Sequence, residues 1–174
     1  MDVVVESWSP HRAHETAQRI HRVYQAVFGD APDEETWRDD SFFVHCDRRG
    51  FRFVAATRES ELIGFAYGYV GERGQWWTDR VAQALPAEVA VEWVGGHFEL
   101  VEIAVLEPYR GRGLGGRLHD LLLSGATTRR ALLGTDVVDG PALRLYRSRG
   151  WQTLGRFGPR MQVMGRLLDA SQDP

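Results

Sequence analysis

The sequence contains no lysine and a single cysteine, and these two absences exclude several kinds of functional site. Cys46 alone permits neither an internal disulfide nor a multi-cysteine metal centre, so no metal is expected. Without lysine, no Gly-Lys-Ser or Gly-Lys-Thr end can form, which excludes a Walker-type phosphate loop. All 21 basic residues are therefore Arg, a bias that we attribute to codon usage.

Long apolar runs and an excess of positive charge are also missing. No stretch approaches the roughly 18 apolar residues of a membrane span, and the start MDVVVESW lacks the basic and apolar parts of a signal peptide. We therefore expect a cytoplasmic location and no membrane partner. The net charge of −3 gives no overall attraction to a phosphate backbone, so nucleic acid is not an expected partner.

The length of 174 residues predicts one domain over residues 1–174, and the contents of 43% hydrophobic and 26% charged residues are typical of a globular protein. Residues 168–174 form a polar tail. A connection over 71–96, rich in Trp, is long enough to be a functional insertion, and we expect a helix near 79–85. Its Trp residues more often pack such a loop onto the domain than line a pocket, and we favour packing.

Periodicity of apolar residues gives the order of the remaining elements. An early strand precedes a helix that ends at Gly29, a second helix, a hairpin with a polar turn, and then alternating strands and helices. The predicted ranges are strands at 3–5, 51–55, 62–70, 97–106, 132–138, 151–157 and 161–167, helices at 20–27, within 32–46, and at 113–125 and 141–149, and the turn at 57–61. This order predicts a mixed α/β fold.

A glycine-rich turn between a strand and a helix is the main functional signal, within the segment EIAVLEPYRGRGLGG at 102–116. Glycines let the backbone turn tightly and approach a ligand without a Cβ in the way. The unpaired amides at a helix N-terminus carry partial positive charge, which favours a phosphate. Arg110 and Arg112 add full charges, so the segment predicts a site for a nucleotide-like cofactor.

Two kinds of nucleotide cofactor fit this turn. Gly111, Gly113 and Gly116 match the dinucleotide pattern G-x-G-x-x-G, and Asp136 lies about 20 residues later, where a ribose-binding acid is expected. However, a Rossmann domain places this pattern after its first strand and needs several further βα units, for which too few residues follow Gly116. Nicotinamide binding is therefore the weaker alternative.

The same residues resemble the GCN5-related N-acetyltransferase (GNAT) family, whose loop reads Arg/Gln-x-x-Gly-x-Gly/Ala. Arg110, Gly113 and Gly115 fit this loop. The segment ALRLYRSRGW at 142–151 resembles a later helix of the family, which ends in Leu-Tyr, three residues, Gly and an aromatic, and it places Tyr146 at the tyrosine. One departure is Asp139, since many members carry Asn where this helix begins.

The resemblance implies a GNAT-like fold, with a mostly antiparallel central sheet of about seven strands flanked by about four helices. It implies acetyl-coenzyme A as cofactor, and a strand that splays from its neighbour near 103–105, where the Val105 N–H can polarise the thioester carbonyl. The implied cofactor-binding residues are Ile103, Ala104, Val105, Arg110, Gly111, Arg112, Gly113, Leu114, Gly115 and Gly116.

The implied activity is acetyl-coenzyme A-dependent N-acetyl transfer to a primary amine by direct attack in a ternary complex. We slightly prefer a small-molecule amine to a protein as the acceptor. The acidic stretch 30–40 could attract a cationic amine, although solvated helix charge is its ordinary explanation. A non-catalytic acyl-coenzyme A sensor is the alternative, and a homodimer is an open expectation.

Catalysis needs a base, because an alkyl ammonium with a pKa near 10 is not a nucleophile at neutral pH. The candidates are Glu99 and Glu102, on the strand that leads into the turn, and strand alternation sends them to opposite faces. We favour Glu99, which precedes the 103–105 triplet by four residues, as a catalytic group does in several members of the family. By resemblance, Tyr146 supplies a proton to the departing thiolate.

Overall fold

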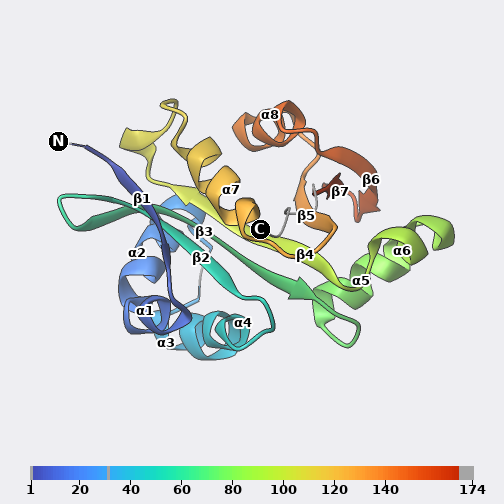
Figure 1. Ribbon diagram of the computed structural model, residues 1–174, viewed down its shortest axis with the longest axis horizontal. Coiled ribbons are helices and arrows are strands. Elements are labelled where there is room, and N and C mark those ends of the chain that lie inside the picture. Colours follow the sequence, from blue (N-terminus) through green and yellow to red (C-terminus); the bar gives the residue numbers. More distant parts are fainter. Residues whose placement is uncertain (1, 31, 169–174) are drawn as a thin grey trace, which may run out of the picture. The chain divides into compact units, whose positions relative to one another are not determined.

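The computed structural model describes residues 2–30 and 32–168, and its seven strands form one sheet in the order β1-β2-β3-β4-β5-β7-β6 (Figure 1). β1 with β2, β2 with β3, β5 with β7 and β6 with β7 pair antiparallel, whereas β4 and β5 pair parallel. This confirms the expected mostly antiparallel sheet. The strands are β1 (Val4–Trp8), β2 (Arg52–Arg58), β3 (Glu61–Gly71), β4 (His97–Val105), β5 (Arg130–Asp136), β6 (Gln152–Phe157) and β7 (Met161–Leu167).

The chain divides into two compact units. The first comprises Met1–Tyr69 and Glu102–Ala126, and the second comprises Val70–Val101 and Thr127–Pro174. Strands β3 and β4 each contribute residues to both units. The single domain expected over 1–174 stays a prediction, and the expected polar tail lies, apart from Leu168, outside the described residues.

Local signals in the sequence explain where the helices of the first unit begin and end. The Ser9 side chain accepts a hydrogen bond from the Arg12 N–H (3.1 Å), and Pro10 presets the first turn of α1. Gly29, in a left-handed conformation (φ 73°), ends α2. The helical segments are α1 (Pro10–Glu15), α2 (Ala17–Phe28), α3 (Glu34–Trp37), the π-helical η1 (Arg38–Phe42), α4 (Phe43–Cys46), the 3₁₀ turn η2 (Glu107–Tyr109) and α7 (Leu114–Ser124).

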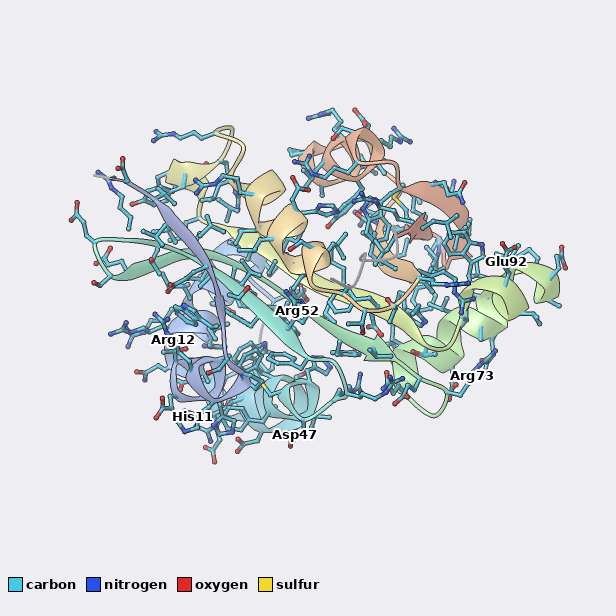
Figure 2. The ribbon with its side chains drawn as sticks, viewed as in Figure 1. His11, Arg12, Asp47, Arg52, Arg73 and Glu92 are labelled. Atoms are coloured by element: carbon cyan, nitrogen blue, oxygen red, sulfur yellow. The ribbon has the colours of Figure 1, made fainter. Side chains whose placement is uncertain are left out.

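Successive side chains of β2 point to opposite faces of the strands in the first unit. Phe53 packs against Phe42 and Tyr67, with ring centroids 6.2 and 6.3 Å away, on the face covered by α1 to α4. Its neighbour Arg52 points to the opposite face, where its Nε donates a hydrogen bond to the Leu122 carbonyl of α7 (3.0 Å; Figures 1 and 2). The first unit therefore has helices on both faces of its strands.

The second unit contains α5 (Trp76–Ala84), α6 (Ala87–Trp93) and α8 (Pro141–Ser148). The connection 71–96 thus holds two helices, separated at Pro86, where one was expected near 79–85. Val81, Leu85 and Trp93 form a buried cluster with Leu132 of β5 and Val163 of β7, and Trp77 packs against its edge. The prediction that the Trp residues pack this segment onto the sheet is confirmed for these two, whereas Trp76 is exposed.

The described residues contain more helical segments than the four or so expected from the sequence. The segment expected within 32–46 consists of two short α-helices on either side of a π-helical stretch, and α1 is separate from α2 at Thr16. The hairpin turn is also tighter than the predicted 57–61, because only Glu59 and Ser60 lie between β2 and β3, at positive φ values of 52° and 68°. Short and irregular helices lack the long apolar period on which the prediction depends.

Arg52 provides a test of how α7 is held on the sheet. Its guanidinium caps the C-terminal end of α7 and lies directly against Gly125, and burial lowers its pKa. We expect Arg52→Met to lower the free energy of unfolding by about 2 kcal/mol, the usual worth of a charge-assisted hydrogen bond. Urea unfolding measures this, with Arg22→Met on the exposed face of α2 as the control. Equal stability of the two variants would contradict the prediction.

Candidate functional site

The glycine-rich turn connects β4 to α7 through two left-handed residues. Gly111 and Gly113 have φ values of 72° and 74°, and Gly113 is the residue from which α7 starts. A Cβ at either position would meet no atom within 4 Å. Backbone conformation therefore requires glycine here, and open space beside both residues leaves room for a ligand.

Unpaired amides line the start of α7. The first hydrogen bond of the helix runs from the Arg117 N–H to the Gly113 carbonyl (3.1 Å), so the N–H groups of Leu114, Gly115 and Gly116 precede it. Arg110 anchors the turn, because its Nε donates to the Val105 carbonyl at the end of β4 (2.8 Å). These residues fit a pyrophosphate, which needs converging N–H donors, positive charge and no Cβ in its way.

The pairing between β4 and β5 ends early. In the part of the second unit that the structure describes, it consists of Phe98 with Ala131 and Glu99 with Leu132. From Leu133 onward, the residues of β5 that pair in the described register pair with β7. Within the second unit, Leu100 and Val101 of β4 thus have no registered partner in β5. The divergence that the resemblance implies near the triplet 103–105 stays a prediction.

Glu102 occupies an acidic and aromatic environment in the first unit. Burial, reinforced by the charge of Asp30, raises the pKa of the Glu102 carboxyl to about 8. Burial and the charges of Glu102 and Asp30 also raise the pKa of the Tyr24 hydroxyl to about 12. Glu102 is intermediate in solvent exposure, neither fully buried nor exposed. A carboxyl group with a pKa near neutral that is not fully buried can accept a proton from a substrate.

Tyr67 borders the same environment and is tied to His45. The ring Nδ1 of His45 lies 3.1 Å from the Tyr67 hydroxyl. Burial, with a smaller contribution from Arg48, lowers the pKa of His45 to about 4, so the ring is neutral at physiological pH. Burial raises the pKa of Tyr67 well above its ordinary value, and the charge of Glu102 acts in the same direction.

Glu99 and Tyr146 belong to the second unit. Glu99 is 4% exposed, between the core residues Phe98 and Leu100. Tyr146, on α8, is 7% exposed and packs edge-to-face on Trp151, with centroids 6.0 Å apart. Asp139, which stands where many family members carry Asn, binds Arg144 through a contact of 2.8 Å. The catalytic roles of Glu99 and Tyr146 stay predictions.

The sequence did not single out Tyr24 or assign Asp30 to a site. Tyr24 lies in the apolar stripe of α2, where periodicity indicates a core residue. Asp30 belongs to an acidic stretch that gave only a hint of a cationic substrate. Among the described residues, no three or more His, Cys, Asp or Glu side chains gather as a metal site. Within 2–30 and 32–168, no helix has both the length and the hydropathy to cross a membrane.

Comparison with known proteins identifies the family to which this turn belongs. The family model described as the Acetyltransferase (GNAT) family matches residues 14–151, which include the glycine-rich turn, Glu102 and Tyr146. The chain belongs to the GNAT family. It is therefore an N-acetyltransferase that uses acetyl-coenzyme A, as the sequence predicted.

Relatives of this GNAT protein include curated and solved examples. It is 32% identical to a GCN5-like protein acetyltransferase of Mycobacterium tuberculosis, over 77% of this chain and 82% of the relative. An acetyltransferase from Thermus thermophilus has a similar structure, with TM-score 0.67, 19% identity, and coverage of 97% of this chain and 98% of that one. The PaiA N-acetyltransferase from Thermoplasma acidophilum, solved with coenzyme A, has TM-score 0.65, 13% identity, and coverage of 97% and 100%. The two solved structures support the fold.

Two glycines with the same conformation provide a matched test of the turn. Gly113 and Gly158 have φ values of 74° and 77°, and a Cβ added at either residue would have no other atom within 4 Å. Alanine at either position should cost about 1 kcal/mol of stability through backbone strain. We expect only Gly113→Ala to weaken coenzyme A binding, by about tenfold, because only its Cβ would face the phosphates. Isothermal titration and thermal unfolding measure both effects, and similar affinity in the two variants would contradict the assignment.

Proposed function

We propose that this GNAT protein acetylates a primary amine by direct attack within a ternary complex, with Glu102 as the general base. The observation that carries the proposal is the environment of Glu102, in which burial and Asp30 raise the pKa of the carboxyl to about 8. A base of this strength matches a substrate ammonium better than an ordinary carboxylate does, because the pKa gap for proton transfer is smaller. Bound acetyl-coenzyme A supplies the acetyl thioester.

Accessibility favours Glu102 over Glu99, which was the preferred base on sequence grounds. Glu99 is 4% exposed and lies in the paired part of β4, in register with Leu132. Glu102 lies three residues later and is intermediate in solvent exposure. A base must come within hydrogen-bonding distance of the amine, directly or through one water, so partial exposure supports Glu102.

The acceptor in this proposal is a small cationic amine. Asp30 offers negative charge, and Glu102 adds to it once it is ionised above about pH 8, while Tyr24 and Phe28, with ring centroids 4.8 Å apart on α2, add aromatic surface. Aromatic rings and carboxylates together favour an ammonium group. The name of the relative from Mycobacterium tuberculosis supports a second candidate, the amine of a protein. A lysine side chain and a small alkylamine present the same reacting group.

Two further residues complete the proposed reaction. The Val105 N–H, at the end of β4, is positioned by the turn that Arg110 anchors, and it would donate a hydrogen bond to the carbonyl oxygen of the acetyl group. The hydroxyl of Tyr146 would supply a proton to the departing thiolate. Both roles follow from the family resemblance. We also keep the cytoplasmic location as part of the proposal.

The pH dependence of Glu102→Gln tests the proposed base. The carboxyl must be ionised to accept a proton, so kcat/KM of the wild type should rise with pH through about 8. Glu102→Gln should remove this rise and lower kcat by at least about 100-fold. The exposed strand residue Glu61 supplies the control, Glu61→Gln. If Glu99→Gln removes the rise and Glu102→Gln does not, Glu99 is the base and the proposal is wrong.

Stability distinguishes loss of the base from loss of the fold. A raised pKa means that the folded state holds a proton between pH 4.5 and about 8 while the unfolded state is ionised. The stabilisation from Glu102 is thus complete at low pH and is lost as the pH rises through about 8. We expect Glu102→Gln to be at least as stable as the wild type above pH 8 by thermal unfolding. A strongly destabilised variant would contradict the raised pKa.

A screen of alkylamines and proteins, followed by release of coenzyme A thiol and mass spectrometry, identifies the acceptor. The absence of lysine helps, because acetyl groups found on lysine must belong to the substrate. Higher kcat/KM for small cationic amines supports the proposal, and higher kcat/KM for a protein supports the second candidate.

A further inference from the structure

The C-terminal part of β4 runs beside the first half of β3 in the first unit. The N–H of Leu106, the residue after β4, donates to the Ile63 carbonyl of β3 (2.9 Å). One residue further along β3, a Cβ added at Gly64 would lie 3.4 Å from the Cα of Val105. Residue numbers therefore rise along β3 as they fall along β4, which is the register of an antiparallel pair.

Continued along both strands, this register sets Tyr67 of β3 opposite Glu102 of β4. Side chains of opposite residues share one face of a sheet, with Cβ atoms about 5 Å apart. The electrostatics agree with this placement, because burial and then the charge of Glu102 raise the pKa of Tyr67 well above its ordinary value. The Tyr67 hydroxyl is therefore a hydrogen-bond donor close to the Glu102 carboxyl.

The Tyr67 hydroxyl has a partner of another kind, the ring of His45 on α4. Nδ1 of His45 lies 3.1 Å from the hydroxyl oxygen. Burial, with a smaller contribution from Arg48, lowers the pKa of His45 to about 4, so the ring is neutral and one of its nitrogens is an acceptor. Tyr67 is 3% exposed and keeps its proton. A protonated hydroxyl beside a neutral imidazole fits donation from the tyrosine to Nδ1.

The direction of this hydrogen bond matters for the ionisation of Glu102. A tyrosine hydroxyl has one proton to donate. Donated to an ionised carboxylate, it would favour the charged form and lower the pKa of that carboxyl. Donated to His45, it leaves Glu102 under the effects of burial and Asp30, which raise the pKa of the carboxyl to about 8.

Other titratable and charged groups also act in this environment. They are Asp30 and Tyr24 at α2, Tyr69 on β3, and Cys46 and Arg48 at α4. Burial raises the pKa of Tyr24 and of Cys46 to about 12, so both groups are neutral at physiological pH. Arg48 lies over the Tyr69 ring, 4.5 Å from its centroid, and opposes a positive charge on His45.

We propose that His45 is a positioning residue, which accepts the hydrogen bond of the Tyr67 hydroxyl and thereby holds this donor away from the Glu102 carboxyl. His45 touches no reacting atom in this role and acts only through Tyr67. Its effect on the ionisation of Glu102 is independent of the reaction. Its effect on catalysis rests on the proposed function, in which Glu102 is the base.

Titration of the Glu102 carboxyl by ¹³C NMR in the full chain tests this role, with the signal assigned by its loss in Glu102→Gln. His45→Leu removes the acceptor and releases the hydroxyl to the carboxylate, so the acid dissociation constant of Glu102 should rise about tenfold. His45→Gln retains an acceptor oxygen and should titrate like the wild type. Tyr67→Phe added to His45→Leu removes the donor and should reverse the rise.

The matched control is His14→Leu. His14 is an exposed residue of α1 whose ring stacks on Phe43, with centroids 3.4 Å apart, and its loss should not change the titration of Glu102. An unchanged constant in His45→Leu, a tenfold rise in His45→Gln, a rise that persists without the Tyr67 hydroxyl, or the same rise in His14→Leu would each overturn the proposal.

Tyr67→Phe alone decides the question if His45→Leu does not fold. When the hydroxyl serves His45, its removal leaves the dissociation constant of Glu102 unchanged. A tenfold fall in that constant would show that the hydroxyl already donates to the carboxylate in the wild type, and the proposal would be wrong. Thermal unfolding establishes which variants are folded.

Kinetics separate this role from the identity of the base. In His45→Leu, the rise of kcat/KM should move to lower pH together with the titration of Glu102. If the titration moves and the kinetic rise does not, Glu102 is not the base, and the role of His45 stands. If neither moves, the role of His45 is excluded, and the pH dependence of Glu102→Gln still decides the proposed function.

Discussion

The passage from β4 into α7 is the constraint on which the first unit depends. After β4 and the 3₁₀ turn η2, two residues, Gly111 and Gly113, adopt left-handed conformations before the chain starts α7. That change of direction exposes the first amides of α7, and Arg110 fixes it by binding the last carbonyl of β4. At the other end of the helix, Arg52 binds the Leu122 carbonyl. Arginines thus hold both ends of the segment whose first amides are proposed to bind the cofactor.

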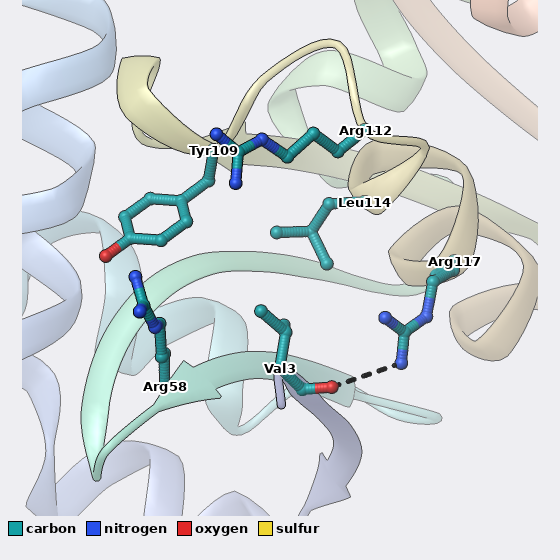
Figure 3. Close-up of a pocket in the computed structure, with 6 residues that line it drawn as sticks. All are labelled: Val3, Arg58, Tyr109, Arg112, Leu114 and Arg117. Carbon is teal, nitrogen blue, oxygen red and sulfur yellow. Dashed lines mark hydrogen bonds between the residues drawn. The ribbon is translucent and has the colours of Figure 1, made fainter. Parts of the chain in front are cut away.

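The first unit carries a group of arginines in one place and a pair of acidic side chains in another. Arg58, Arg112 and Arg117 line one pocket beside the turn, where phosphates are expected (Figure 3). Glu102 and Asp30 interact with each other and with Tyr24, where the proposed acceptor is a cation. A net charge of −3 conceals this arrangement, because opposite charges cancel in the sum and not in space. The same protein can therefore attract an anionic cofactor and a cationic amine.

The raised pKa of Glu102 shows how the surroundings of a strand residue can change its proton affinity. Sequence position alone gave two carboxylates on one strand and no physical means of ranking them. Burial of Glu102 near a second acid stabilises its neutral form, whereas Glu99 lies among apolar residues in the paired part of the strand. The preference therefore moved to Glu102 because the structure describes the environment of each group.

The sequence by itself determined the order of strands and helices, the glycine-rich turn, and the family, because these depend on local periodicity, on backbone conformations that require glycine, and on short motifs. It did not determine the two helices in 71–96 or the division of 32–46, where short segments lack a clear period. Only the tertiary structure decided that Arg58 and Arg112 line one pocket, that Asp30 acts on Glu102, and that Glu102 acts on Tyr24. Long-range pairing of strands and packing of helices set those distances, and no local pattern records them.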